Sequence, residues 1–334
     1  MDEHSYGYSI SMTPLLPVPA GPNSTAARSA LLTGTTGSLI ESIDPFDRDT
    51  QLAWFMLNEA SFGGWADVDD TAEWDPAVVA LRRQIEDWFE RTIDVDRDVV
   101  DAVELVNATL SAEGPSMSRF LADYGTTIQV IESLMLRYPY QSKEADPHTF
   151  AIPRLTGTVK RALCEIQAGE YGVGHRSTHA ELFISALRAI EPRAKSFVLD
   201  RLPGVAYATS NLVSMGGLNR ARRGIAVGQL ALFEMDSVVP NGVMVQTCDR
   251  LELPAATRRF FEVHVMADVE HEAIAQQAFL IDYPIREPDQ IPNILFGVRA
   301  QHAIDSALAH HAVRAWSNGL SALDGADDVS SVAA

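Results

Sequence analysis

The sequence predicts an all-α protein that forms a helical bundle as a single domain. From Asp47 onward, apolar residues recur at the spacing of three and four that marks one face of a helix. The only stretch rich in Val and Ile, residues 238–245, is short and is interrupted by Pro240 and Gly242, so convincing strand alternation is absent. The connections between the helical segments are short enough for antiparallel neighbours.

The helices expected in the first half follow breaks made by Gly and Pro. Residues 51–59 form a short apolar helix that a Gly-Gly pair ends. Pro76 suits the first helical position and opens a helix over 77–93, whose apolar residues keep helical spacing. Amphipathic patterns predict the next helices over 98–111, 116–138 and 150–170.

The second half continues the same pattern. A helix over 178–190 closes before Pro192, and an uninterrupted helix over 218–236 is expected to stop at Pro240-Asn-Gly242. A long helix then runs from Ala255 to near 282. A last helix covers 291–320.

The two ends of the chain are expected to lie outside the domain. Residues 1–46 read as a partly flexible arm, because prolines interrupt 9–29 and the segment lacks the basic start and continuous apolar core of a signal peptide. The helical domain covers 47–320. The tail, 321–334, consists of small and acidic residues and is expected to be disordered.

Composition excludes several classes of protein and partner. The net charge of −19 argues against nucleic acid and anionic membrane surfaces as partners. Two cysteines without CxxC spacing, Cys164 and Cys248, exclude a disulfide framework and a thiolate zinc site and fit the cytoplasm. No apolar run reaches the length of a membrane span. We expect a small-molecule substrate as the partner, and a homodimer is compatible with the sequence.

A stripe of ligand-type residues is the most informative feature. His264, Asp268 and His271 fall at i, i+4 and i+7, so they share one face of the long helix. Two imidazoles and one carboxylate match the ligand set of non-haem iron sites that keep positions open for dioxygen. Burying such a stripe is costly unless it is paired or bound to a metal. The spacing therefore favours a metal site over a solvated acidic helix face.

One helix stripe cannot complete a dinuclear site, so carboxylates from other helices are also needed. Glu234 lies in an otherwise apolar helical segment, where its alternative role is to pair with Arg222 or Arg223. Glu165 and Glu170 precede His179, and for each of these three a helix-end or surface role stays open beside ligation. The other histidines that we considered are weaker candidates and are expected in turns, at the surface or in the core: His175, His302, His310 and His311.

These residues carry a resemblance to the haem-oxygenase-like diiron oxidases and oxygenases, a family of iron-containing redox enzymes. The motifs that resemble it are Glu165-Ile-Gln, Glu170-Tyr-Gly-x-Gly, His179-Ala-Glu-Leu-Phe, Glu234, His264-x3-Asp268-x2-His271 and, more loosely, the acidic Trp-containing loop 63–76. The resemblance covers roughly 47–320. It implies a haem-oxygenase-like bundle that binds two Fe(II) ions, with dioxygen as co-substrate.

The resemblance also implies a ligand set and a reaction. Glu170 and His179 would be ligands, with Glu165 as the alternative to Glu170. Glu234 would be the bridging or second carboxylate, and the stripe would complete the set with His264, Asp268 and His271. Similar enzymes desaturate, cleave or N-oxygenate small metabolites, so we expect an amino acid or amino-acid-derived substrate in natural-product biosynthesis.

Two other functions stay open. A fatty-acid-oxidising, decarboxylating member of the same fold would need a long apolar tunnel, whereas an enzyme for amino acids would place an Arg or an acid near the metals. A non-catalytic helical interaction protein would hold no iron. Haem binding is disfavoured, because clustered carboxylates suit hard iron ions rather than a porphyrin with one axial His.

Overall fold

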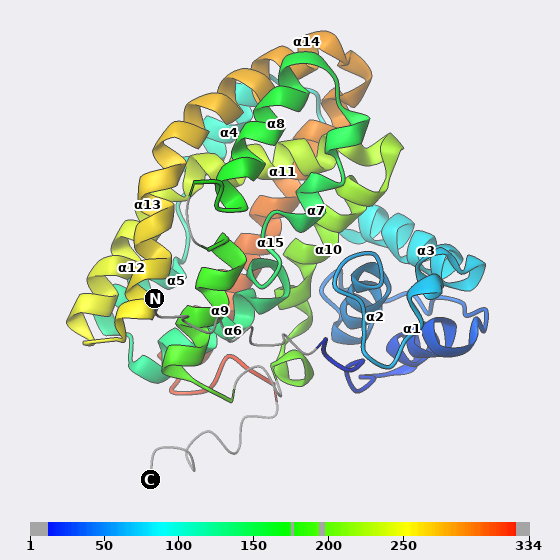
Figure 1. Ribbon diagram of the computed structural model, residues 1–334, viewed down its shortest axis with the longest axis horizontal. Coiled ribbons are helices and arrows are strands. Elements are labelled where there is room, and N and C mark those ends of the chain that lie inside the picture. The colour runs from blue at the N-terminus through cyan, green and yellow to red at the C-terminus, as the bar shows by residue number, and fades with distance from the viewer. Residues whose placement is uncertain (1–12, 175–176, 194–197, 325–334) are drawn as a thin grey trace, which may run out of the picture.

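The computed structural model describes residues 13–174, 177–193 and 198–324, with only the backbone described for 267–269. Every regular element in these ranges is a helix, which confirms the all-α class (Figure 1). The α-helices are α1 (Pro22–Thr33), α2 (Arg48–Glu59), α3 (Pro76–Thr92), α4 (Ala102–Leu110), α5 (Met117–Tyr124), α6 (Thr127–Gln141), α7 (Asp146–Thr149), α8 (Gly157–Glu170), α9 (His179–Ile190), α10 (Gly204–Leu218), α11 (Arg223–Asp236), α12 (Val238–Arg250), α13 (Ala255–Ala275), α14 (Tyr283–Arg286) and α15 (Ile291–Ser317).

The helices form one bundle with a smaller group at its side. Figure 1 shows α1, α2 and α3 gathered beside the bundle, where α2 packs on α10. Helix α11 contacts α10, α13 and α15, and α13 also packs on α9 and α12. A π-helical segment, Gln276–Asp282, continues α13 into α14. The long motif helix was therefore predicted at nearly its full length.

Two glycines let α11 and α15 cross with their backbones in contact. A Cβ on Gly228 of α11 would lie 2.1 Å from the carbonyl oxygen of Ile294, and a Cβ on Gly297 of α15 would lie 2.3 Å from that of Ile225. Neither position tolerates a side chain without moving the helices apart. This close crossing fixes the position of α11 in the bundle.

Helix α10 was not among the predicted helices. Nearly all of its residues are buried, from Gly204 through Gly217. A helix that is buried all round shows no amphipathic stripe, so its sequence carries no periodic signal. Small residues let its neighbours approach, since a Cβ on Gly217 would lie 2.1 Å from the carbonyl oxygen of Pro147 in α7.

The segment expected as an arm contains the packed helix α1. Its first amides, those of Asn23 and Ser24, donate to the carboxylate of Asp49 on α2, at 2.7 and 2.8 Å. Ala27, Ala30 and Leu31 are buried in the core. The helix was missed because its N-terminal cap comes from a residue about 25 positions away, which local patterns do not reveal. The start of the expected tail also packs, since Ala322 and Leu323 are buried and the Ala322 amide donates to Glu132 at 2.9 Å. The expectations for residues 1–12 and 325–334 lie outside the described residues.

Several other boundaries also differ from the expectation, and two of them have a local explanation. The helix expected over 116–138 is divided into α5 and α6 at Gly125, and a capping box between Thr126 and Gln129 starts α6. Pro240, at the expected stop, instead lies in the first turn of α12. The preceding helix, α11, ends earlier, at Asp236, and Ser237 separates the two helices. Proline is tolerated in that first turn because the first helical amides need no partner within the helix.

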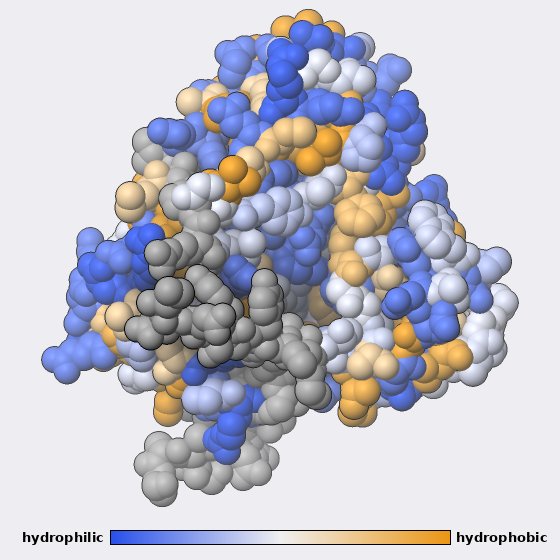
Figure 2. Space-filling model, in the orientation of Figure 1, coloured by the Kyte–Doolittle hydropathy of each residue, from blue (hydrophilic) through white to orange (hydrophobic). Residues whose placement is uncertain are grey.

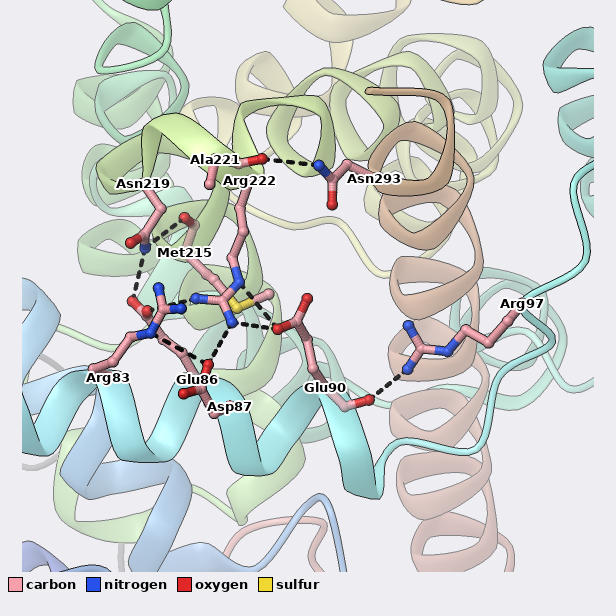
Figure 3. A network of polar contacts seen from close by, with 10 residues as sticks. All are labelled: Arg83, Glu86, Asp87, Glu90, Arg97, Met215, Asn219, Ala221, Arg222 and Asn293. Carbon is pink, nitrogen blue, oxygen red and sulfur yellow. Dashed lines mark hydrogen bonds and ion pairs between the residues drawn. The ribbon is translucent and has the colours of Figure 1, made fainter. Parts of the chain in front are cut away.

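A buried arginine fastens α3 to the bundle (Figure 3). Arg222 lies just before α11, and its guanidinium binds three acids of α3: Glu86 at 3.1 Å, Asp87 at 2.6 Å, and Glu90. Asn219 adds a hydrogen bond to Glu86 at 2.9 Å. The charges of Arg222 and Glu86 therefore satisfy each other inside the protein.

None of the helices in the described ranges combines the length and apolar composition that a membrane crossing requires. The face seen in Figure 2 is mostly hydrophilic, and hydrophobic residues occur there as small separate patches.

Candidate metal centre

Five of the six predicted ligands meet in the bundle. They come from four helices: Glu170 ends α8, His179 begins α9, Glu234 lies on α11, and His264 and His271 lie on α13. All five side chains are buried. The sixth prediction, Asp268, lies on α13 between the two histidines, but its side chain is outside the described residues.

The first group of side chains surrounds the start of α9. Glu144, Glu170, His179 and His264 each offer one ligand atom, and these atoms all lie within 4.8 Å of one another. Glu170 Oε2 lies 2.7 Å from His179 Nδ1, and Glu144 Oε2 lies 3.4 Å from His264 Nε2. Two carboxylates and two imidazoles therefore converge on one point.

The second group shares a member with the first. Glu170, Glu234 and His271 also offer ligand atoms within 4.8 Å of one another. His271 Nδ1 lies 3.2 Å from Glu234 Oε2 and 3.7 Å from Glu170 Oε1. Glu170 thus directs one carboxylate oxygen toward each group. The two groups are adjacent and linked through this residue.

The tautomer of His264 is set by the helix that carries it. Its Nδ1 lies 2.8 Å from the carbonyl oxygen of Phe260, which can only accept, so Nδ1 carries the proton. Nε2 then has its lone pair available on the side of Glu144. A histidine held this way is typical of metal ligands in proteins.

The buried charges of the centre fit a metal cation. Glu144 Oε2 is buried and accepts no hydrogen bond from the described residues. A carboxylate oxygen in that position is costly unless a cation compensates it. Burial opposes ionisation of Glu170, but the hydrogen bond from His179 and the nearby imidazoles lower the pKa of its carboxyl overall. Carboxylate oxygens and imidazole nitrogens are ligands that suit iron, so the residues present fit that metal.

Comparison with known proteins agrees with this chemistry. Residues 132–305, more than half of the chain, match the model of a family described as iron-containing redox enzymes. The chain belongs to this family. It is therefore an iron-dependent oxidoreductase with a haem-oxygenase-like helical fold. Both groups of side chains lie inside the matched range. A search of curated proteins finds no match to the chain.

Sequence reasoning missed Glu144. This residue lies in the turn between α6 and α7, where a charged side chain ordinarily faces water, yet only 11% of its side chain is exposed. The sequence offers one weak signal, because Asp146-Pro147 marks a turn and a helix start just after it. Nothing local shows that the turn is directed inward.

The structure distinguishes the alternatives that the sequence left open for the carboxylates. Glu234 was expected as the bridging or second carboxylate; it lies in the second group, and Glu170 is the carboxylate common to both groups. Glu165, the alternative to Glu170, is exposed on α8. The two arginines that were considered as partners of Glu234 pair with other acids: Arg222 with acids of α3, and Arg223 with Glu287.

The remaining histidines behave as expected where they are described. His302 and His310 are exposed, and His311 lies 2.9 Å from the carbonyl oxygen of Ala322 through its Nε2. His175 lies outside the described residues.

The Glu170-Tyr-Gly motif has a structural reason. Gly172 adopts a φ of +69°, and a Cβ on it would lie 2.3 Å from the carbonyl oxygen of Ser177. The chain can therefore turn sharply from α8 toward α9, where Thr178 and Glu181 form a capping box. His179 is the first residue of that helix. The motif thus brings Glu170 and His179 together across a short connection.

Gly169 makes room for a ring of the second group. A Cβ on this residue would lie 2.9 Å from His271 Nε2 and 3.0 Å from Cε1. Real Cβ atoms almost never approach other atoms so closely, so only glycine allows α8 to pass this near to α13 while His271 keeps its position.

Proposed function

We propose that this iron-dependent oxidoreductase is a dinuclear non-haem iron oxygenase or oxidase. In this proposal it uses dioxygen to desaturate, cleave or N-oxygenate a small amino acid or amino-acid-derived metabolite in natural-product biosynthesis. The observation that carries the proposal is the position of Glu170 between two adjacent groups of carboxylates and imidazoles. A carboxylate shared in this way suits two neighbouring metal ions held in a bundle core.

The ligands would divide between the two ions. Glu144, Glu170, His179 and His264 would hold one ion, and Glu170, Glu234 and His271 would hold the other. Asp268 is proposed as a further ligand on the strength of its place in the His-x3-Asp-x2-His stripe. When bound, the Fe(II) ions would supply open coordination positions at which dioxygen is activated.

The protein's own residues would prepare this site before any reaction. His264 Nδ1–H would donate to the carbonyl oxygen of Phe260, so the unprotonated Nε2 would offer its lone pair to the ion. The ring of Phe260 packs against His264 at 4.7 Å and against Phe183 at 5.5 Å, and both Phe side chains are buried. These aromatic rings exclude water from one side of the site, which protects a reactive oxidant from side reactions.

A charged substrate is favoured by a buried ion pair whose lysine, Lys143, directly precedes Glu144 in the chain. The Lys143 ammonium pairs with the Glu59 carboxylate, and their side chains are 9% and 11% exposed. The same ammonium lies 5.0 Å from the ring centre of Phe55 and 4.5 Å from that of Phe62. The pair offers a cation for a substrate carboxylate and an anion for a substrate amine. Such a pair suits an amino acid better than the alkyl chain of a fatty acid.

Oxygen uptake tests the proposed reaction. The chain is loaded with Fe(II) without oxygen, and panels of amino acids, amino-acid derivatives and fatty acids are then added with oxygen. We expect uptake and an oxidised product with a member of the first two panels. Oxygen uptake with fatty acids alone would show that the protein is a fatty-acid-oxidising enzyme. A chain that retains no iron would show that it is a non-catalytic interaction protein.

A pair of lysine variants tests whether Lys143 contacts the substrate. Lys143→Met should raise KM for a carboxylate-bearing substrate more than tenfold, because a buried charged hydrogen bond is lost. Lys160→Met, which changes a lysine on α8, should leave KM unchanged. Equal KM values for Lys143→Met and the unchanged protein would remove Lys143 from the substrate site.

A further inference from the structure

The turn that carries Glu144 has an unusual backbone. Ala145 adopts a φ of +81° and a ψ of −36°, which residues with a side chain rarely adopt, and it is 1% exposed. Its carbonyl oxygen accepts two hydrogen bonds, from the Thr149 amide at 3.0 Å and from Gln167 Nε2 at 2.6 Å. An outlier of this kind persists only where its surroundings hold it, and it is often found at functional sites.

Two side chains at the C-terminal end of α8, those of Gln167 and the capping residue Tyr171, hold this turn. Gln167 is 2% exposed, and its Nε2 also donates to Thr149 Oγ1 at 2.6 Å. One helical turn later, the Tyr171 hydroxyl donates to Asp146 Oδ1 at 2.8 Å and lies 2.9 Å from Thr149 Oγ1. These contacts fix the residues on the C-terminal side of Glu144, including Ala145.

The same stretch of helix presents Glu170. Gln167 and Glu170 belong to the last turn of α8, and Tyr171 is the residue that caps its C-terminal end. The C-terminal end of α8 therefore carries Glu170 itself and also contacts the turn that carries Glu144.

We infer that Gln167, supported by Tyr171, is a positioning residue that sets the place of Glu144 relative to Glu170. The inference rests on the proposed function, in which both carboxylates bind the same ion. The hydrogen bonds of Gln167 go to Ala145 and Thr149 rather than to either ligand. Gln167 acts by holding the carbonyl of Ala145, and so keeps the turn in the conformation that directs Glu144 inward.

A purely structural role for Gln167 makes a different prediction. If Gln167 only filled the core, its loss would lower the stability of the fold without a selective effect on Glu144. If Gln167 holds Ala145, the loss of Gln167 should release the turn. A residue at position 145 that adopts positive φ freely should then keep the conformation of the turn without Gln167. Glycine is such a residue. Ala145→Gly should therefore compensate for the loss of Gln167.

Iron affinity in a set of variants tests the inference. Fe(II) is titrated calorimetrically into metal-free protein without oxygen. Gln167→Met keeps the length of the side chain but removes its donor, and it should weaken one of the two iron equivalents about 10- to 100-fold, as expected for a residue that supports a ligand. Glu144→Ala should weaken the same equivalent. The double variant of Gln167 and Glu144 should bind iron no more weakly than Glu144→Ala alone.

Two further variants separate positioning from packing. Adding Ala145→Gly to Gln167→Met should recover a large part of the lost affinity. Gln51→Met is the matched control, because Gln51 is also buried and its Nε2 donates to a loop carbonyl, that of Pro45, at 2.6 Å. It should leave both iron affinities unchanged. Additive losses in the double variant, or equal losses in Gln51→Met and Gln167→Met, would overturn the inference.

Hydrogen exchange in the metal-free protein tests the turn without iron. Gln167→Met should speed exchange of the Thr149 amide, which donates to Ala145, at least tenfold, and Gln51→Met should not. Unchanged exchange would overturn the inference even if iron binding fell. If the unchanged protein binds no iron, the proposed function fails, while this exchange measurement still decides whether Gln167 holds the turn.

Discussion

Gly169→Ala should separate iron binding from folding. The new Cβ would lie 2.9 Å from His271 Nε2, whereas ordinary contacts of a Cβ begin near 3.4 Å, so the ring must move by about half an ångström. The ring is buried between Glu170 and Glu234, which leaves it little room to move. A shift of this size is enough to spoil a metal site. The protein should therefore lose iron at the second group.

The fold should tolerate the same change. Replacing a helical glycine by alanine favours the helix by about 0.5–1 kcal/mol, which offsets part of the crowding. Gly242→Ala is the matched control, because Gly242 also lies within a helix, α12, and a Cβ on it meets nothing within 4 Å. We expect about one iron per chain for Gly169→Ala and two for Gly242→Ala, both with cooperative thermal unfolding. Two tightly bound irons in Gly169→Ala would refute the placement of His271 in the site.

Three other predictions concern the motif helix, the α3 contact and pH. Asp268→Ala should lose much of the iron and essentially all oxidation, whereas Glu270→Gln, which changes an exposed residue, should keep both; equal damage would mean that the ligand face is misassigned. Arg222→Leu should lower the free energy of unfolding by about 3–5 kcal/mol, because Glu86 stays buried without its cation, and a denaturant titration with a smaller loss would contradict this. Burial lowers the pKa of His148 from 6.5 to about 4, so the unfolded chain binds more protons between these values. Stability of the metal-free protein should therefore fall by about 3 kcal/mol as pH drops from 6.5 to 4, and the same fall in His148→Leu would exclude this cause.

Part of the centre could be predicted because local spacing determines it. Three residues on one helix at i, i+4 and i+7 must share a face, and the structure indeed buries His264 and His271 and exposes Glu270. Glu234 was found because a carboxylate in an apolar helix needs a reason to be buried. The Gly172 turn explains why Glu170 and His179 could be paired from the sequence.

The rest depended on contacts between distant segments. Glu144 is directed inward by a turn that α8 holds through Gln167, more than twenty residues later in the chain. Helix α1 depends on a cap from Asp49 on α2. Helix α10 is buried on every side and shows no periodicity. In each case the deciding interaction joins elements that only the folded structure brings together.

We propose that Glu170 belongs to two iron sites at once. Iron content after anaerobic loading with Fe(II) and gel filtration tests it in three alanine variants, of Glu144, Glu234 and Glu170. We expect about two irons per chain in the unchanged protein, about one in Glu144→Ala and in Glu234→Ala, and close to none in Glu170→Ala, with all three variants folded. One tightly bound iron remaining in Glu170→Ala, as in the other two variants, would contradict the shared carboxylate.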